Sequence, residues 1–416
     1  MVDCCSAPGL MPMNKAKETL LANIKPLTDT ENIALIDCDS RVCASTVISP
    51  INVPAHNNSA MDGYAFCADF SQQPFINANT TFTLVGTAMA GQPYTGTLAI
   101  GECIRIMTGA VVPDSANTVE MQENITVNNT TITTTQTTPK GNHIRLAGED
   151  IAQGEQVFTQ GHKFSSIDIG LLASLGVNSI NVLRKPVVAV FSTGDELKLA
   201  SDSLALGDIY ESNRYVLIAM LKRMNVDVID LGIISDDKEK IRQAFLTADQ
   251  KADVVVSSGG VSVGDADYTK EVLEELGHIA FWKIAMKPGK PFAFGHLENS
   301  LFFGLPGNPV SATVTFHQLA IPAIKKLSGQ KNTAPLLLSA KTTDKIKKRA
   351  GRMDFQRGIA FTTENNQLMV TPLTHQGSGV LSSMSQANCY IVLSQEHTGC
   401  SVGEHVNIEL FDAIIG

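Results

Sequence analysis

The sequence lacks the patterns that mark a disulfide-stapled, zinc-binding or membrane-spanning protein. Its eight cysteines form no CxxC pair, and none lies between Cys103 and Cys389. Scattered thiols are typical of a reducing cytosol, so we expect a cytoplasmic protein without a disulfide framework or a zinc site. No apolar run reaches the roughly 18 residues that a membrane span needs, and the N-terminus lacks the basic and apolar regions of a signal peptide.

Positive charge is also scarce, because 32 Lys and Arg stand against 41 Asp and Glu, a net charge of −9. Nucleic-acid binding needs clustered cations, so we expect no nucleic-acid partner. The one dense basic run, residues 345–349, is interpreted as a solvated strand edge or loop. Two nucleotide-binding signatures are missing, since no GxGxxG follows the first strand of the α/β region and there is no GxxxxGK[ST] motif.

The 416-residue chain, with 44% hydrophobic residues, is long enough for two to four domains with substantial cores. The pattern predicts a multidomain α/β and β fold: a doubly wound, mainly parallel α/β domain, a discontinuous N-terminal domain, an inserted small β-domain and a C-terminal β-barrel-like domain. The expected boundaries are 1–54 plus 146–184 for the discontinuous domain, 55–145 for the insert, 185–333 for the α/β domain and 334–416 for the C-terminal domain.

The outer regions carry mostly strand patterns. A helix is expected over 14–24, a β-like run over 31–49 and a short apolar helix over 166–175. Between them, Thr-dense segments with period-2 alternation predict strands, and the Thr-rich stretch 130–138 favours an exposed hairpin. After residue 333 the pattern is β alone, which predicts a small barrel or sandwich.

Strands alternate with helical segments from residue 185 to residue 330, and the last expected helix covers 311–327. This alternation predicts βαβ units and a mainly parallel sheet, in which ligands bind beyond the carboxyl ends of the strands. The polar loops all follow expected strands, and they cover 192–196, 236–237, 258–267, 283–290 and 306–309.

The most informative of these loops follows the short apolar run Val254–Val256. Gly259 and Gly260 allow positive φ and leave backbone amides uncovered, which suits a phosphate. Asp265 and Asp267, after Ser262, suit a divalent cation that would neutralise that phosphate. An ordinary strand-to-helix turn is the alternative interpretation of this stretch.

Other loops carry weaker signals. Pro306-Gly307-Asn308-Pro309 is a rigid helix start whose amides favour an anion, although a simple helix entrance explains it equally well. Lys283, Lys287 and Lys290 share one turn and indicate a polyphosphate or an oxyanion. Asp62 precedes a glycine, which by itself is typical of a hairpin turn, and Thr108 is expected at the rim of the β insert.

Six motifs in this order, SAMDGYAF, STGDEL, SGGVSVGDADY, MKPGKP, LPGNP and GRMDFQRG, closely resemble the molybdopterin molybdenumtransferases. The module of this family also forms one end of gephyrin, and the resemblance covers nearly the whole chain. It implies four domains, a homodimer with its active site near the subunit boundary, and cooperation with a molybdopterin adenylyltransferase. The implied reaction converts adenylylated molybdopterin and molybdate into molybdenum cofactor and AMP with Mg²⁺.

The resemblance also implies residue roles. Asp62, Thr108, Glu196, Asp267, Lys283 and Lys287 match catalytic positions, with Asp62 and Thr108 closing over the site from this subunit or its partner. Metal positions are Glu196, Asp236 and Asp267. Positions that bind the pterin nucleotide or molybdate are Gly259, Gly260, Ser262, Pro306, Asn308, Pro309, Arg357 and Ser378.

Three alternatives are weighed beside this interpretation. The related adenylyltransferase shares the α/β domain, but it looks like that domain alone and lacks the β insert and the C-terminal barrel. A non-catalytic, gephyrin-like scaffold would keep the fold without needing the acidic and lysine residues. A tungstate-handling relative is harder to separate, because tungstate and molybdate are nearly isosteric.

Overall fold

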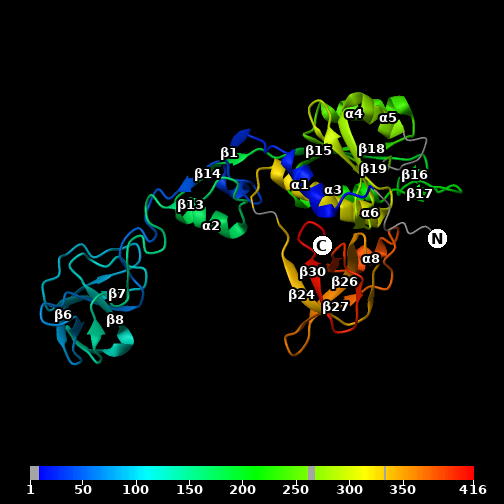
Figure 1. Cartoon of the computed structure of the whole chain (residues 1–416). Coiled ribbons are helices and arrows are strands. Elements are labelled where there is room, and N and C mark those ends of the chain that lie inside the picture. The colour runs from blue at the N-terminus through cyan, green and yellow to red at the C-terminus, as the bar shows by residue number, and fades with distance from the viewer. Residues whose placement is uncertain (1–8, 261–267, 332–333) are drawn as a thin grey trace.

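The computed structural model describes residues 9–260, 268–331 and 334–416. The molecule is elongated (Figure 1), with a β group that includes β6 (Thr81–Ala88), β7 (Glu102–Ile106) and β8 (Thr118–Met121) at one end. The α/β sheet and the C-terminal strands lie at the other end. The segment with β1 (Thr30–Ala34) and α2 (Ser166–Ser174) lies between them.

The sheet that positions the site has six strands in the order β18-β15-β19-β23-β22-β20. Neighbours from β18 to β23 are parallel, whereas β22 pairs antiparallel with β23 and β20. In chain order the bounds are β15 (Val187–Thr193), β18 (Asp227–Ile234), β19 (Val254–Ser258), β20 (His278–Lys283), β22 (Pro291–His296) and β23 (Leu301–Leu305). The predicted mainly parallel sheet is confirmed.

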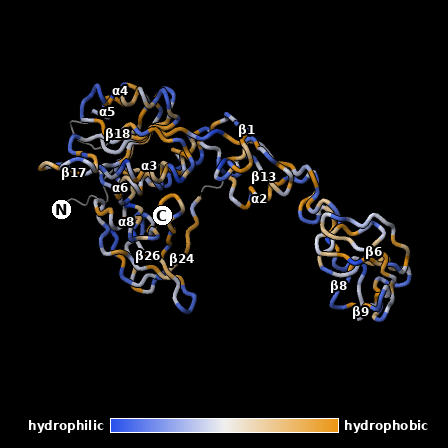
Figure 2. Tube along the Cα trace, turned by 180° about the vertical axis from the view of Figure 1, so that it is seen from behind, coloured by the Kyte–Doolittle hydropathy of each residue, from blue (hydrophilic) through white to orange (hydrophobic). Residues whose placement is uncertain are grey.

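Helices cover both faces of this sheet. One core contains residues of α1, α3, α6 and α7, and a second core on the opposite face contains residues of α4 and α5. Strands beside β18 are accordingly hydrophobic in Figure 2. The helices are α1 (Met13–Ala22), α3 (Asn213–Arg223), α4 (Lys238–Asp249), α5 (Tyr268–Leu276), α6 (Pro309–Thr315) and α7 (Ile321–Leu327).

The C-terminal strands close into a five-stranded barrel, because β26 pairs with both β27 and β28. Its strands are β24 (Leu337–Thr342), β26 (Met353–Thr362), β27 (Leu368–Pro372), β28 (Cys389–Leu393) and β30 (His405–Leu410), joined by the short helix α8 (Ser382–Gln386). Phe355 and Tyr390 of the barrel belong to the same core as α1 and α6. Packing therefore fixes the barrel against the α/β sheet. The predicted C-terminal barrel is confirmed.

The remaining elements are the helix α2, a local hairpin and four strand pairs that join distant parts of the chain. Helix α2 has the predicted position and begins with a capping box between Ser165 and Asp168. The Thr-rich hairpin is β9 (Ile125–Asn128) with β10 (Thr131–Thr134). The other pairs are β1 with β14 (Ser179–Leu183), β2 (Val47–Ile48) with β13 (Gln156–Phe158), β3 (Asn58–Ser59) with β12 (Ile144–Arg145), and β5 (Phe75–Ile76) with β11 (Thr138–Pro139).

Two element predictions need correction. The run 31–49 is not one strand, because a 3₁₀ turn at Leu35–Asp37 follows β1 and buries Leu35. The single helix expected over 311–327 is interrupted by a π-helical turn, Phe316–Ala320, between α6 and α7. Pro322 has no N–H to donate to the preceding turn, and a wider helical turn accommodates that missing bond.

Candidate functional site

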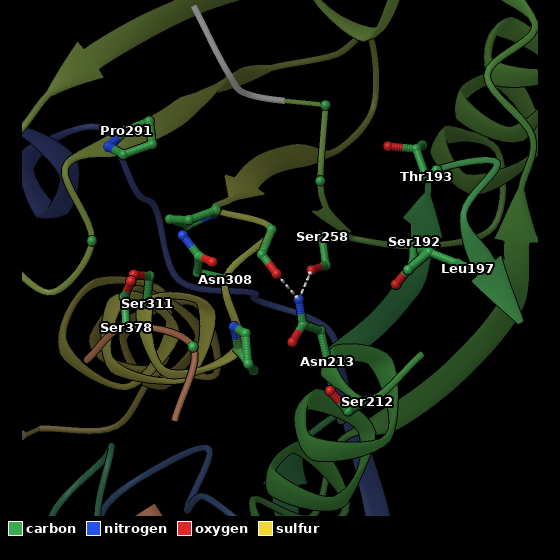
Figure 3. A pocket seen from close by; sticks show the side chains of 18 of the residues that line it. Ser192, Thr193, Leu197, Ser212, Asn213, Ser258, Pro291, Asn308, Ser311 and Ser378 are labelled. Atoms are coloured by element: carbon green, nitrogen blue, oxygen red, sulfur yellow. Dashed lines mark hydrogen bonds between the residues drawn. The ribbon is translucent and has the colours of Figure 1, made fainter. Parts of the chain in front are cut away.

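A cavity of about 1240 Å³ opens beyond the carboxyl ends of the parallel strands. Ser192 and Thr193 end β15, Ser258 ends β19, and the loop from Pro306 to Pro309 follows β23. Residues 376–379 of the barrel face this loop, so that Ser378 lies near Ser311 in Figure 3. The cavity therefore lies where an open α/β sheet binds its ligands, and the barrel supplies one wall.

The glycine turn after β19 has the predicted backbone conformation, with φ of +92° at Gly259 and +65° at Gly260. A Cβ at Gly259 would lie 2.7 Å from the carbonyl oxygen of Thr193, and one at Gly260 would lie 2.2 Å from the Thr269 hydroxyl. Neither position accepts a side chain without displacing its neighbour. The turn thus brings backbone close to the cavity, as an anion site requires.

An asparagine outside the sequence motifs joins two of these loops. The Asn213 side-chain amide, at the start of α3, donates 2.7 Å to the Ser258 hydroxyl and 2.8 Å to the Gly307 carbonyl (Figure 3). Its signal in the sequence is weak, because asparagine at a helix start is usually a capping residue. Here it fixes the loops after β19 and β23 relative to each other.

The start of α6 faces the same cavity. Pro309 occupies the first helical position, where its missing N–H costs nothing. Asn308 is the N-cap residue, and its side chain makes no capping hydrogen bond. Pro306, Asn308 and Pro309 all line the cavity, as predicted for the rigid loop.

Carboxylates form another part of the wall. Glu196 and Asp236 line the cavity from the loops after β15 and β18. Burial, together with the negative charges of Asp195 and Glu196, raises the pKa of Asp236. In the described part of the chain, no group of three or more His, Cys, Asp or Glu side chains is arranged to hold a metal ion. Ser262 and Asp267, which were predicted here, lie outside the described residues.

A buried carboxylate beside the cavity was not predicted. Glu211 is 4% exposed, accepts from the Ser192 hydroxyl at 3.1 Å and from the Arg214 backbone N–H at 2.7 Å, and lies 3.5 Å from the Arg214 guanidinium. These contacts tie the end of β15 to the first turn of α3. We interpret Glu211 as a positioning residue.

Two lysines of the predicted turn line the cavity. Lys287 is exposed, and its ammonium lies 3.5 Å from the carboxylate of buried Asp354. Lys290 lines the cavity beside Gly289. A Cβ at Gly289 would lie 2.2 Å from the Thr315 hydroxyl, so the turn packs directly on α6. Lys283 is exposed in β20 and is not among the described lining residues.

The barrel contributes Ser378 and an arginine other than the predicted one. Arg357 is 1% exposed, and its guanidinium donates to the Ser383 hydroxyl at 3.1 Å and to the Gly377 carbonyl at 3.2 Å. Burial lowers the pKa of this guanidinium. The structure therefore places Arg357 behind the loop that carries Ser378, while Arg352 lines the cavity.

Asp62 and Thr108 lie in the distant β group rather than at the cavity of the same chain (Figure 1). The Asp62 carboxylate accepts at 2.7 Å from both the backbone N–H and the hydroxyl of Thr108. These two hydrogen bonds lower the pKa of Asp62. The pair is therefore an exposed, ionised acidic corner, held next to the glycine turn at Gly109.

Three family models match consecutive parts of the chain. Residues 11–176 match the MoeA N-terminal region (domain I and II), residues 189–326 match a probable molybdopterin binding domain, and residues 339–411 match the MoeA C-terminal region (domain IV). Among the described residues, no helix combines the length and apolar character needed to cross a membrane.

Similar proteins match nearly the whole of this chain. The chain is 44% identical to a molybdopterin molybdenumtransferase of Haemophilus influenzae, over 98% of this chain and 100% of that protein. It is 30% identical to gephyrin of Dictyostelium discoideum, over 98% of this chain and 63% of gephyrin. The structure of a molybdopterin biosynthesis moeA protein from Pyrococcus horikoshii matches with a TM-score of 0.83 and 28% identity, over 97% of this chain and 100% of that one. These matches confirm the predicted fold class, and the chain belongs to the molybdopterin molybdenumtransferase family.

Proposed function

We propose that this chain inserts molybdenum into adenylylated molybdopterin, using molybdate and Mg²⁺ and releasing AMP. The observation behind the proposal is a single cavity lined by two kinds of anion-binding group. One is the glycine turn with the start of α6, and the other is a set of cationic and hydroxyl side chains, Lys290, Ser311, Arg352 and Ser378. Its volume of about 1240 Å³ exceeds the range of roughly 300–1,000 Å³ for ordinary ligand pockets, which leaves room for a nucleotide and an oxyanion.

The glycine turn would hold the phosphates of the nucleotide. Gly260 would present its backbone amide beyond the end of β19, whereas the Gly259 N–H donates to the Leu305 carbonyl at 3.2 Å. The loop from Pro306 to Pro309 adds the positive end of a helix dipole. Asn213 keeps these two loops together. Fixed amides of this kind bind phosphate without reorganising, which favours tight and oriented binding.

Asn213→Ala is expected to raise the KM for adenylylated molybdopterin about tenfold, because loops that drift apart misplace the phosphate-binding amides. Loss of the bridging hydrogen bonds should also lower the free energy of unfolding by about 1–2 kcal/mol. Steady-state kinetics and urea denaturation test both effects. Asn32→Ala, which removes a surface hydrogen bond to Asn181, is the control, and an equal KM in both variants would contradict the bridging role.

The carboxylates suit a magnesium ion. Mg²⁺ prefers oxygen ligands and retains several waters, so Glu196 and Asp236 are suitable donors. Asp267, the third predicted metal position, lies outside the described residues. Burial is the main cause of the raised pKa of Asp236, and a bound cation would offset the second cause, the negative charges of Asp195 and Glu196. When bound, Mg²⁺ would neutralise part of the charge on the phosphoanhydride oxygens.

The basic side would hold the reacting groups. Lys287 would stabilise the negative charge that develops as water cleaves the phosphoanhydride between AMP and the molybdopterin phosphate. Molybdate is a tetrahedral dianion whose oxygens accept hydrogen bonds. Suitable donors are the cationic groups of Lys290 and Arg352 and the hydroxyls of Ser311 and Ser378. The dithiolene sulfurs that bind molybdenum belong to the substrate, so the chain need not supply a thiolate. Lys283 would contribute through the long-range field.

We also propose that the chain acts as a homodimer, in which Asp62 and Thr108 of one subunit complete the cavity of its partner. Thr108 follows β7, and Asp62 is hydrogen-bonded to it. Figure 1 shows β7 at the opposite end of the molecule from the α/β sheet, so both residues lie far from the cavity of their own chain. A two-fold dimer would let the β group of each subunit reach the cavity of the other. An adenylyltransferase that produces the adenylylated substrate is the expected partner in the cytoplasm.

Mixed dimers test this arrangement. Asp62→Ala and Lys287→Met should each lose activity, but an equal mixture of the two subunits should recover about a quarter of the wild-type rate, because half of the dimers are mixed and each has one complete site. Co-expression followed by an AMP-release assay measures the recovery. If Asp62 serves its own subunit, every site in the mixture lacks one residue and no activity returns.

The reaction itself is tested by measuring AMP release from adenylylated molybdopterin with Mg²⁺, with and without molybdate. Molybdate-dependent release with formation of cofactor is the expected result. Formation of adenylylated molybdopterin from ATP would instead identify an adenylyltransferase. Tight nucleotide binding without any release would favour a gephyrin-like scaffold, and release with tungstate but not molybdate would identify a tungstate enzyme.

A further inference from the structure

A second cavity, of about 790 Å³, lies against the substrate cavity on the barrel side. Lys287 and Arg352 line both cavities, so these two side chains form a common wall. The rest of the second cavity comes from the barrel, chiefly from the basic run 345–349 and the segment 398–404. The family motifs include none of the residues of that run.

This second cavity is strongly positive. Two carboxylates, Asp354 and Glu404, stand against six cationic side chains, Lys287, Lys345, Lys347, Lys348, Arg349 and Arg352. Asp354 is 3% exposed and lies beside the Lys287 ammonium. Such a concentration of cations is unusual in a chain with a net charge of −9. We refer to these residues as the basic cavity.

The strand pattern explains why the lysines gather. In β25 (Ile346–Lys347), paired with β29 (Gly399–Cys400), Ile346 is 2% exposed and belongs to the barrel core. Because side chains alternate along a strand, Lys345 and Lys347 lie on the opposite face. The Lys348 ammonium donates to the carbonyl of His397 at 2.8 Å, which ties the adjoining loop to the run.

The run is also tied to the wall between the cavities. The Gln356 side-chain amide donates at 3.1 Å both to the Asp354 carboxylate and to the Lys347 carbonyl. Asp354 in turn faces Lys287, which lies in β21 (Met286–Lys287), and β21 pairs with β26. A fixed polar chain therefore joins the basic run to a lysine of the substrate cavity.

We propose that the basic cavity is a second binding site for tetrahedral oxyanions, which holds molybdate beside Arg352 before it enters the substrate cavity. A concave surface lined by one sign of charge focuses the electrostatic field and raises the local concentration and association rate of an anion by about 10–10³-fold. Because the chain has a net negative charge, the association rate of a dianion would rise most at such a positive cavity. The identity of the anion rests on the proposed function.

Anomalous diffraction from crystals soaked in molybdate tests the site directly. We expect one molybdenum peak beside Ser311 and Ser378 and a second beside Lys345, Lys347 and Arg349. A single peak in the substrate cavity, at concentrations that fill it, would overturn the proposal. A peak in the basic cavity of an enzyme that shows no molybdate-dependent turnover would contradict the proposed function and leave this site standing.

A charge-matched pair of variants supplies the solution test. The triple substitution of Lys345, Lys347 and Arg349 by Gln should lower kcat/KM for molybdate about tenfold at low ionic strength and flatten its salt dependence. The control replaces Lys15, Lys222 and Lys251 by Gln. These lysines are exposed and lie outside the basic cavity, so the control changes the net charge by the same amount. Equal kcat/KM in the two triple variants would overturn the proposal. Lys345→Gln alone, at an exposed position, gives the same test if the triple variant fails to fold.

Discussion

Asp236→Asn is expected to slow molybdate-dependent AMP release by at least about 100-fold. The substitution removes one carboxylate from the pair that would hold Mg²⁺, while the side-chain volume stays nearly constant. Because the carboxylate is crowded by Asp195 and Glu196, its loss should leave the free energy of unfolding unchanged or slightly higher. The Mg²⁺ concentration for half-maximal rate should rise, which a purely structural role would not produce.

The neighbouring residue provides the matched control for this prediction. Asp237 is the N-cap residue of α4, and its carboxylate accepts from the Lys240 backbone N–H at 2.9 Å. Asn caps helices about as well as Asp, so Asp237→Asn should keep both the fold and the rate. Both variants are titrated with Mg²⁺, and their rates of AMP release are compared. If the two rates agree within about threefold, Asp236 has no role in the reaction.

Arg357→Met is expected to lower the free energy of unfolding by about 3 kcal/mol or more. The guanidinium is buried, and its hydrogen bonds to the Ser383 hydroxyl and the Gly377 carbonyl would be lost. The Gly377 carbonyl would keep only the longer bond, of 3.4 Å, from the Val380 N–H. Met fills much of the space but donates nothing. Arg357→Lys should not restore the stability, because an ammonium cannot reproduce the planar fork of donors.

Arg352→Met is the companion measurement. Arg352 is half-buried and lines the cavity, so its loss should raise the KM for molybdate and change the unfolding free energy by less than about 1 kcal/mol. Urea denaturation and molybdate titration of both variants separate the two roles. A stable Arg357→Met variant with a raised KM for molybdate would return Arg357 to the oxyanion site.

The alternation of side chains along β26 separates Arg357 from Arg352, which the sequence motif does not. In GRMDFQRG both arginines are equally plausible ligands. In β26, however, Arg357 lies on the face of Met353 and Phe355, which pack in the core shared with the α/β sheet. Arg352 comes just before the strand and remains at the cavity. Period-2 counting from Phe355 could have separated them, but only once β26 was known to be buried on that face.

Local patterns predicted much of the α/β region for a physical reason. The apolar run at β19, the two glycines after it and Pro309 at a helix start each have a narrow range of allowed structures. Contacts between residues far apart in the sequence left no comparable pattern in it. Asn213 acts through Ser258 and Gly307, and the run 345–349 faces Lys287 across the barrel wall. Such contacts depend on packing that the sequence does not show locally.

The same dependence on packing explains the misjudged last helix. Its hydrophobic pattern is continuous from residue 311 to residue 327, and every residue of the π-helical turn Phe316–Ala320 is buried. Pro322 marked a weak point, but the position of the wider turn follows from how α6 and α7 pack between the sheet and the barrel.

One time course that follows AMP and molybdenum cofactor in the same reaction mixture tests whether this chain inserts molybdenum. Purified protein, adenylylated molybdopterin and Mg²⁺ are mixed, and molybdate is either included or omitted. The proposed function predicts that AMP and cofactor form at the same rate and in equal amounts with molybdate, and that neither forms without it. AMP release at the same rate in the absence of molybdate would contradict molybdenum insertion and identify a simple phosphoanhydride hydrolase.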